Sequence, residues 1–275
     1  MRRGHTDVIL EIPEGFQAGV DAGVPAMPHV SANGVNGIKG SLGSRYVVQS
    51  VMQTLARYSG REIKENVSVQ YLFNPTLEYR NNMIPALMII LLIMICGFLP
   101  TLNLIGEKES GTIEQMNVTP VRPAVFVLSK VVPYWLIGII DITLGMGIAA
   151  LVYGLHPAGS LGAIYLAALL FVFVISGIGI IIANFSDSMS QGMFVMFFIV
   201  MVFILMSGLL TPITSMPQWA QYITYALPPR YFIDIMRSIY LKATPAAALW
   251  PAFASLAAFA LAANTLAALT FRKSS

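Results

Sequence analysis

Polar and charged residues gather in one short stretch of a chain that is otherwise mostly apolar. Residues 106–123, GEKESGTIEQMNVTPVRP, lie between two long hydrophobic runs. Thr112 can cap a helix, and the glutamine three residues later completes a capping box. Glu114 then falls in the first helical turn, where the helix dipole favours an anion, and Pro120 and Pro123 end the helix. The spacing predicts a short, capped polar helix, which is more than a plain connector requires and suggests a docking surface for another protein.

A second polar residue stands alone inside an apolar run. Asp141 lies near the middle of residues 125–153, where a carboxylate facing lipid would be costly. We therefore expect it to face the bundle interior, a water-filled path or a second copy of the subunit. It either contacts a substrate or a gate, or it hydrogen-bonds a neighbouring helix and fixes packing. The packing role is favoured, because buried polar groups in bundles are commonly satisfied by neighbours.

Residue patterns for other chemistry are missing from the sequence. There is no G-x-x-x-x-G-K-[ST] loop to hold a nucleotide phosphate, and no evident Ser/His/Asp or Cys/His set. His5, His29 and His156 are scattered, away from metal-ligand spacing. The single cysteine, Cys96, lies in an apolar run and excludes an intrachain disulfide. We expect no catalytic, metal or cofactor site in this chain.

The composition indicates an integral membrane protein. Hydrophobic residues make up 56% of the chain and the mean hydropathy is +0.73. Charged residues make up 11%, against about 25% in ordinary soluble domains. The net charge of +3 suits contact with lipid headgroups, and no dense basic stripe indicates nucleic acid as a partner.

Five runs are long and apolar enough to cross a bilayer, which takes about 20 residues. They lack the strict alternation of strands, and backbone groups in lipid must satisfy their own hydrogen bonds, so each is expected to be a helix. The sequence thus predicts an α-helical polytopic membrane protein with five transmembrane helices, at residues 83–105, 125–153, 161–183, 192–211 and 246–271.

Residues 1–82 differ from the rest and predict a small α+β region. Strands are expected at residues 7–12 and 66–73 from their β-branched and aromatic alternation, and a helix at 45–59 from its apolar spacing. The Gly-, Pro- and Asn-rich residues 19–43 are expected to form a loop.

Between the last two runs, residues 212–245 are aromatic and interrupted by Pro228 and Pro229. One or two short interfacial helices are expected here, because Trp and Tyr favour the headgroup layer. Re-entrant helices are the alternative. Arg230 and Asp234 stand four residues apart, the spacing of a helical ion pair.

Several of these stretches together resemble one protein family. GEKESGTIEQMNVTPVRPAVFVLSKVVPYW resembles the E-x-G-T-x-E … T-P … K-x-x-P pattern of type-2 ABC exporter (ABC-2) permeases. LFNPTLEYRNNMIPALM is similar to the family's entry into its second span, and GLLTPITSMPQWAQYITYALPPRYFIDIMRSIYLK to its extracytoplasmic helices before the last span. DVILEIPEGF resembles the start of its extracytoplasmic domain.

The resemblance implies a cytoplasmic coupling helix at residues 106–123 that meets an ABC ATP-binding subunit. Residues 1–82 and 212–245 would then be extracytoplasmic, in a multi-pass protein of the bacterial inner membrane. A second permease copy or paralogue would complete the pathway. Carried over by position, the ATPase-coupling surface comprises Glu107, Gly111, Thr112, Glu114 and Pro120.

The expected function is that of a permease subunit that exports a drug-like, lipid or other amphiphilic substrate, with ATP hydrolysed by the separate subunit. The alternatives are a secondary transporter or channel, or a membrane scaffold without transport. Relatives of this type have a span ahead of the extracytoplasmic domain, and no apolar run precedes residue 7. A truncated chain, or one that starts at an internal Met, is the corresponding expectation.

Overall fold

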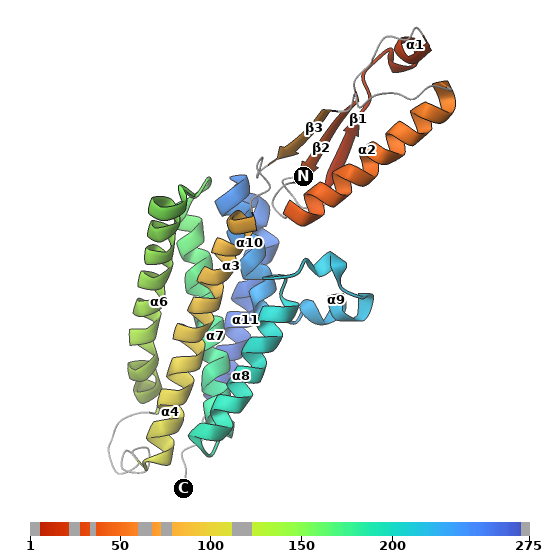
Figure 1. The fold of residues 1–275 in the computed structure, drawn as a ribbon. Helices are drawn as coiled ribbons and strands as arrows, with labels where there is room; N and C mark the ends of the chain where they lie inside the picture. The colour runs from red at the N-terminus through yellow and green to blue at the C-terminus, as the bar shows by residue number, and fades with distance from the viewer. Residues whose placement is uncertain are drawn as a thin grey trace. The chain divides into compact units, whose positions relative to one another are not determined.

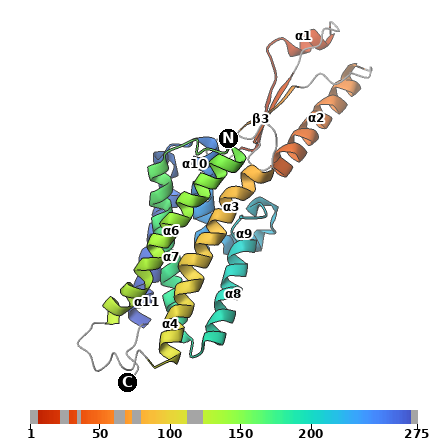
Figure 2. The same cartoon turned by 60° about the vertical axis from the view of Figure 1, so that its left-hand side comes forward.

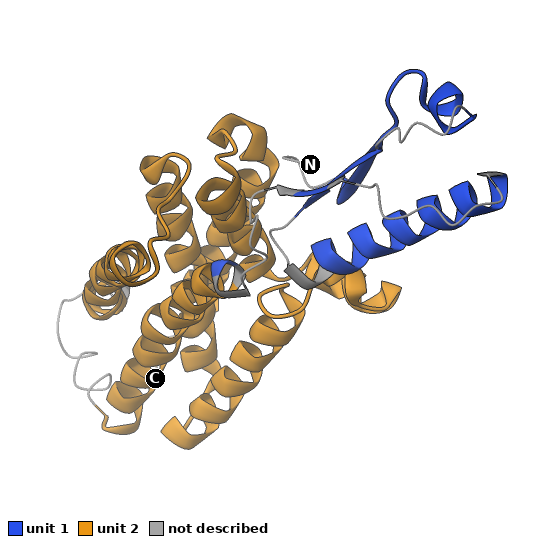
Figure 3. Ribbon diagram, turned by 45° about the horizontal axis from the view of Figure 1, so that its top comes forward, with its two compact units in different colours: residues 1–82 blue, residues 83–275 orange. Residues whose placement is uncertain are grey.

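The computed structural model describes residues 6–21, 28–33, 37–59, 68–72, 79–111 and 123–270. The chain divides into two compact units, Met1–Asn82 and Met83–Ser275 (Figure 3). Each unit has its own packing and is described by itself.

The first unit is a three-stranded sheet with a long helix. Its elements are β1 (Val8–Glu11), α1 (Phe16–Asp21), β2 (His29–Asn33), α2 (Gly37–Ser59) and β3 (Ser68–Leu72). The central strand β2 pairs antiparallel with β1 and parallel with β3, and the parallel pair is joined through α2, as a crossover requires. Val30 and Ala32 of β2 are fully buried, and α2 packs against this strand.

The predicted strands in this unit are present, but the predicted loop is wrong. Residues 19–43 contain all of β2 and the first turns of α2. Glycine and asparagine weaken the local strand and helix signals there. The structure places Gly43 of α2 close to Val8 of β1, where an added Cβ would lie 3.1 Å from Val8 Cγ2. This contact with the strand explains a glycine inside the helix.

The second unit is a helical bundle (Figures 1 and 2). Five helices are long and apolar enough to cross a membrane, which confirms the predicted number of spans among the described residues. The elements of the bundle, in chain order, are α3 (Tyr79–Ile93), η1 (Met94–Phe98), α4 (Leu99–Glu109), α6 (Pro123–Tyr153), α7 (Leu161–Phe185), α8 (Met189–Met206), η2 (Ile213–Ser215), α9 (Gln218–Thr224), α10 (Pro228–Lys242), η3 (Ala246–Leu249) and α11 (Trp250–Thr270).

Helix α7 is the centre of the bundle. It packs against α4, α6, α8, α10 and α11. In the most apolar stretch of α7, 67% of the residues are buried, whereas only 22% are buried in the corresponding stretches of α6 and α8. Helices α6 and α8 therefore present broad apolar faces to their surroundings. The approach of α11 is close because Gly177 lies against the backbone of Ala263, the small-residue contact that membrane helices favour.

The first span is one continuous helix with a π-helical segment. In η1 the Leu99 N–H donates to the Met94 carbonyl, five residues back. Pro100 follows, and it has no N–H to continue the α-helical ladder, which accounts for the wider turn before it. Thr101 Oγ1 donates to the Gly97 carbonyl at 2.6 Å and satisfies that acceptor.

The segment between the fourth and fifth spans contains two short helices, α9 and α10, where the sequence predicted one or two. The fourth span itself ends at Met206, earlier than the expected residue 211. Pro228 and Pro229 start α10, where a proline costs no hydrogen bond. Tyr240 of α10 donates to the Leu155 carbonyl at 3.0 Å, and burial raises the pKa of its phenol to about 12.

Candidate functional site

The end of the first span is where four membrane helices meet. The sequence predicted that this span stops at residue 105 and that a separate polar segment follows. This boundary is wrong: α4 continues to Glu109 as part of the span. Residues 106–109 therefore form the last helical turn, and the side chains of Glu107, Lys108 and Glu109 reach α6, α7 and α8.

Glu107 is paired inside the bundle. Its Oε1 accepts from Lys130 Nζ of α6 in a short ion pair, and both side chains are partly shielded from solvent. A partly shielded pair is screened less by salt than an exposed one. The pair ties the end of the first span to the beginning of the second.

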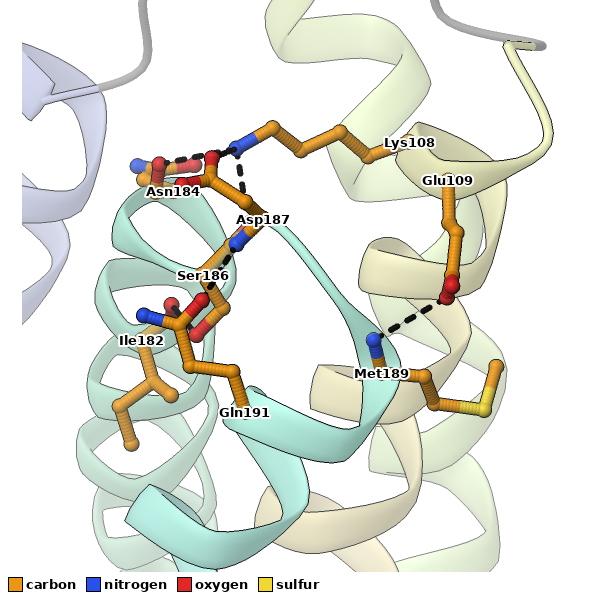
Figure 4. A network of polar contacts seen from close by, with 8 residues as sticks. All are labelled: Lys108, Glu109, Ile182, Asn184, Ser186, Asp187, Met189 and Gln191. Carbon is orange, nitrogen blue, oxygen red and sulfur yellow. Dashed lines mark hydrogen bonds and ion pairs between the residues drawn. The ribbon is translucent and has the colours of Figure 1, made fainter.

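Lys108 holds the C-terminal end of α7 (Figure 4). Its Nζ donates to the carbonyls of Asn184 at 3.4 Å and Ser186 at 2.9 Å, and to Asp187 Oδ1 at 3.2 Å. Carbonyls at a helix C-terminus lack intrahelical partners, and the dipole there favours a cation. Since the Asp187 side chain is 89% exposed, the carbonyl contacts contribute more than the ion pair.

Glu109 holds the N-terminal end of α8 (Figure 4). Its Oε2 accepts from the Met189 N–H at 3.0 Å, a donor that has no partner within the helix. Ser188 is the N-cap and its Oγ accepts from the Gln191 N–H at 3.3 Å. The negative carboxylate also complements the positive end of the helix dipole.

Two glycines allow this close approach. A Cβ added at Gly106 would lie 2.9 Å from Met189 Cε of α8. A Cβ added at Gly192 would collide with Ile105 Cδ1 of α4. The end of α4 and the beginning of α8 therefore pack directly against each other, beneath the polar contacts of Lys108 and Glu109.

The structure places two of the five predicted coupling residues. Glu107 makes the internal pair with Lys130. Gly111 follows the end of α4 with φ at +72°, a conformation in which glycine costs least, and its N–H donates to the Lys108 carbonyl at 3.2 Å. Thr112, Glu114 and Pro120 lie outside the described residues, as does most of the predicted polar helix.

Sequence reasoning missed Lys108, Glu109 and the turn between α7 and α8. The signal for Glu109 was present, since it is the first glutamate of the E-x-G-T-x-E pattern. The partners of both residues lie about 80 positions along the chain, and no local pattern indicates such a pairing. Only the fold brings them together.

Asp141 lies on the face of α6 that packs against the first span. Gly138 and Gly145 share this face, and a Cβ added to them would lie 3.0 Å from Leu92 Cδ1 and 3.0 Å from Met88 Cγ. Asp141 Oδ2 is buried and has no hydrogen-bond partner in the part of the chain that the structure describes. The hydrogen bond to a neighbouring helix that the packing role requires is not seen for this oxygen. The role of Asp141 stays a prediction.

Two arginines of α10 donate hydrogen bonds at the opposite end of the bundle. Arg237 donates to the Gly208 and Leu209 carbonyls at 2.8 and 2.7 Å. Arg230 donates to Thr224 Oγ1 of α9 and lies 3.8 Å from the ring centroid of Tyr225. Its hydrogen bonds go to α9 and not to Asp234, which the sequence spacing suggested as its partner.

These features define a class of protein. The chain is a polytopic helical membrane protein, and the polar contacts at one end of its bundle join helices without forming a catalytic set among the described residues. No nucleotide-binding loop occurs in the sequence.

The comparisons identify the family. The profile described as ABC-2 family transporter protein matches residues 1–269, so the chain belongs to this family. It is the membrane permease subunit of an ABC transporter, in the bacterial inner membrane.

Its relatives carry consistent descriptions. One is the "Probable multidrug ABC transporter permease YbhR" of Escherichia coli (strain K12), 24% identical over 269 residues, which are 97% of this chain and 73% of that protein. Another is the "Inner membrane transport permease YhhJ" of the same strain, 27% identical over 285 residues, covering 98% and 74%. The "Probable multidrug ABC transporter permease YbhS" is 27% identical over 177 residues, covering 64% and 47%. No solved structure matches the chain.

Proposed function

We propose that this permease exports an amphiphilic substrate, and that a separate ATP-binding subunit drives it by docking on residues 106–123. The observation that carries the proposal is the last turn of α4. Glu107 contacts α6, Lys108 contacts α7, and Glu109 contacts α8. A displacement applied just after this turn therefore reaches four spans, as rigid-body gating requires.

The chain contains no phosphate-binding loop, so ATP hydrolysis comes from the partner subunit. The permease works with a second copy or a paralogue, which packs on part of the apolar surface that α6 and α8 expose. Drug-like or lipid-like molecules are the favoured substrates, because two of the relatives are described as probable multidrug permeases. Residues 212–245 and the first unit face the outside of the cell.

Charge reversal at Glu114 tests the docking surface. The tagged permease is purified with Glu114→Arg, bound ABC ATP-binding subunits are quantified by mass spectrometry, and ATP hydrolysis is measured. We expect binding to fall several-fold, because a charge that faces the partner is inverted. Normal binding, hydrolysis and export would refute the docking site.

A matched control separates docking from bundle stability. Glu107 faces Lys130, so reversing Glu107 alone also breaks an internal pair. The swap Glu107→Lys with Lys130→Glu keeps the pair and inverts the charge at both positions. If Glu107 also contacts the ATP-binding subunit, the swap lowers binding while the yield of folded permease stays normal.

A further inference from the structure

We infer that Lys108 and Glu109 are positioning residues that make the turn between α7 and α8 move together with the end of α4. The inference rests on the proposed function, in which force arrives at the segment after Gly111. It adds a second point of force transfer in the membrane domain, beside the direct covalent path into α6.

The charges of the two residues match their targets. Lys108 and Glu109 are neighbours in the chain, yet they reach two different helix ends (Figure 4). The ammonium group contacts the C-terminal carbonyls of α7 and the carboxylate contacts the first N–H of α8. Each charge is opposite in sign to the partial charge of the helix end that it meets. The last turn of α4 thus contacts both helix ends that flank the α7–α8 turn.

The α7–α8 turn is itself held in one conformation. Ser186 is buried and its Oγ donates to the Ile182 carbonyl at 2.8 Å. The Asp187 N–H donates to Gln191 Oε1 at 3.0 Å, and Ser188 caps α8. A turn with its backbone groups satisfied in this way transmits a displacement to both helices.

Apolar contact supports the polar one. Gly106 and Gly192 bring α4 and α8 together against Met189 and Ile105. The two glycines allow α4 and α8 to pack closely, while the two charged residues determine which helix ends are in contact. Loss of the charged contacts should therefore leave the bundle folded and loosen its response to the partner.

The first experiment measures coupling in the permease co-purified with its ATP-binding subunit and reconstituted in vesicles. Lys108→Met and Glu109→Ala remove the contacts, whereas Lys108→Arg and Glu109→Gln retain a donor and an acceptor. Ser190→Ala is the matched control, an exposed α8 residue next to the network. Because Lys108 and Glu109 lie within the docking segment 106–123, the bound ATP-binding subunit is quantified for every variant and transport is compared at equal ATP hydrolysis. We expect a several-fold fall in substrate moved per ATP hydrolysed in the first two variants only.

The outcomes of this experiment separate the two claims. If Lys108→Met and Glu109→Ala move substrate at the normal ratio, the inference is wrong and the proposed function stands. If the wild-type permease binds no ATP-binding subunit at all, the proposed function fails. The contact between the end of α4 and the α7–α8 turn is then tested by the cross-link of the second experiment, which forms in the permease alone if the two are adjacent.

The second experiment is a cross-link between Lys108→Cys and Asp187→Cys, with Cys96→Ala as background. A short linker that reacts with both thiols replaces the lost lysine chain, whose Nζ lies 3.2 Å from Asp187 Oδ1. If the turn moves with α4, the linker forms with equal yield with and without ATP, and it restores transport to the uncoupled double variant. A yield that changes with ATP, or a linker that blocks transport, overturns the inference.

Discussion

The carboxylate of Asp141 lies in mid-span with a buried oxygen that has no partner among the described residues. A buried polar atom without a hydrogen bond costs about 1–3 kcal/mol. The fold therefore gains no hydrogen bond from this oxygen. This shifts the balance from the packing role toward contact with a substrate or a gate.

We expect Asp141→Leu to fold as well as the wild type, or to be more stable by up to about 2 kcal/mol, because it removes an unsatisfied group. Transport should fall sharply, while Asp141→Asn folds normally and transports at an intermediate level. Thermal unfolding in detergent and vesicle transport measure the two properties. A lower yield of folded Asp141→Leu would instead show that the carboxylate is a packing residue.

Arg237, in contrast to Asp141, is a charged side chain that donates hydrogen bonds to backbone carbonyls. Its guanidinium donates to the Gly208 and Leu209 carbonyls, and Gly208, with φ at +87°, lies just after the end of the fourth span. Arg237→Ala removes both donors and should cost roughly 2–4 kcal/mol of stability.

Arg237→Lys is the informative comparison, since a lysine keeps the charge but lacks the planar fork. We expect it to recover less than half of the loss, as read from the thermal midpoint in detergent. Full recovery by lysine would mean that the charge, and not the paired hydrogen bonds, stabilises this turn.

At the scale of elements, the contact of α7 with α11 depends on small residues. A Cβ added at Gly177 would lie 3.0 Å from Ala263 Cβ and 3.1 Å from the Ala263 carbonyl carbon. Backbone cannot give way as a flexible side chain can, so Gly177→Ala should lower stability by about 1–3 kcal/mol.

Gly147→Ala in α6 is the matched control, because an added Cβ there meets nothing within 4 Å. It should be neutral or stabilising by up to about 1 kcal/mol, since alanine is the better helix former. Thermal midpoints of both variants in the same detergent test the contrast. Equal midpoints would show that α7 and α11 are not in close contact.

Elements could be predicted from the sequence where the physics is local. The five spans follow from hydropathy, since the bilayer requires long apolar helices. Residues 106–109 were assigned to a separate polar helix after the first span, because Glu107, Lys108 and Glu109 have no apolar pattern. Their helix is stabilised by partners in α6, α7 and α8, which lie far away in the sequence.

The same limit applies to β2 and to the α7–α8 turn. The sequence predicted a loop at residues 29–33, because no local pattern indicates a strand there. Pairing with β1 and β3 stabilises the strand in the structure. The candidate site was only partly predictable for the same reason. Motif spacing indicated that the segment after Gly106 is functional. The ends of α7 and α8 that this segment contacts are brought to it only by the fold.

At the scale of the whole molecule, the five spans among the described residues have a topological consequence. Helices that cross in succession place the end of α4, the α7–α8 turn and the end of α11 on one side of the membrane. The residues between α6 and α7, and those of α9 and α10, then lie on the other. Basic residues near both ends of the spans prevent the sequence from deciding which side is inside.

The proposed function requires the α7–α8 turn to be cytoplasmic, and cysteine labelling tests this orientation. Ser190→Cys and Ser160→Cys are placed singly in a Cys96→Ala background, since both serines are exposed and Cys96 is buried. A membrane-impermeant maleimide added to spheroplasts should label Ser160→Cys, and it should label Ser190→Cys only after the membrane is opened. The cytoplasmic ATP-binding subunit can reach the last turn of α4 only in this orientation. Labelling of Ser190→Cys from outside would place Lys108 and Glu109 on the wrong side of the membrane and remove the basis for coupling through them.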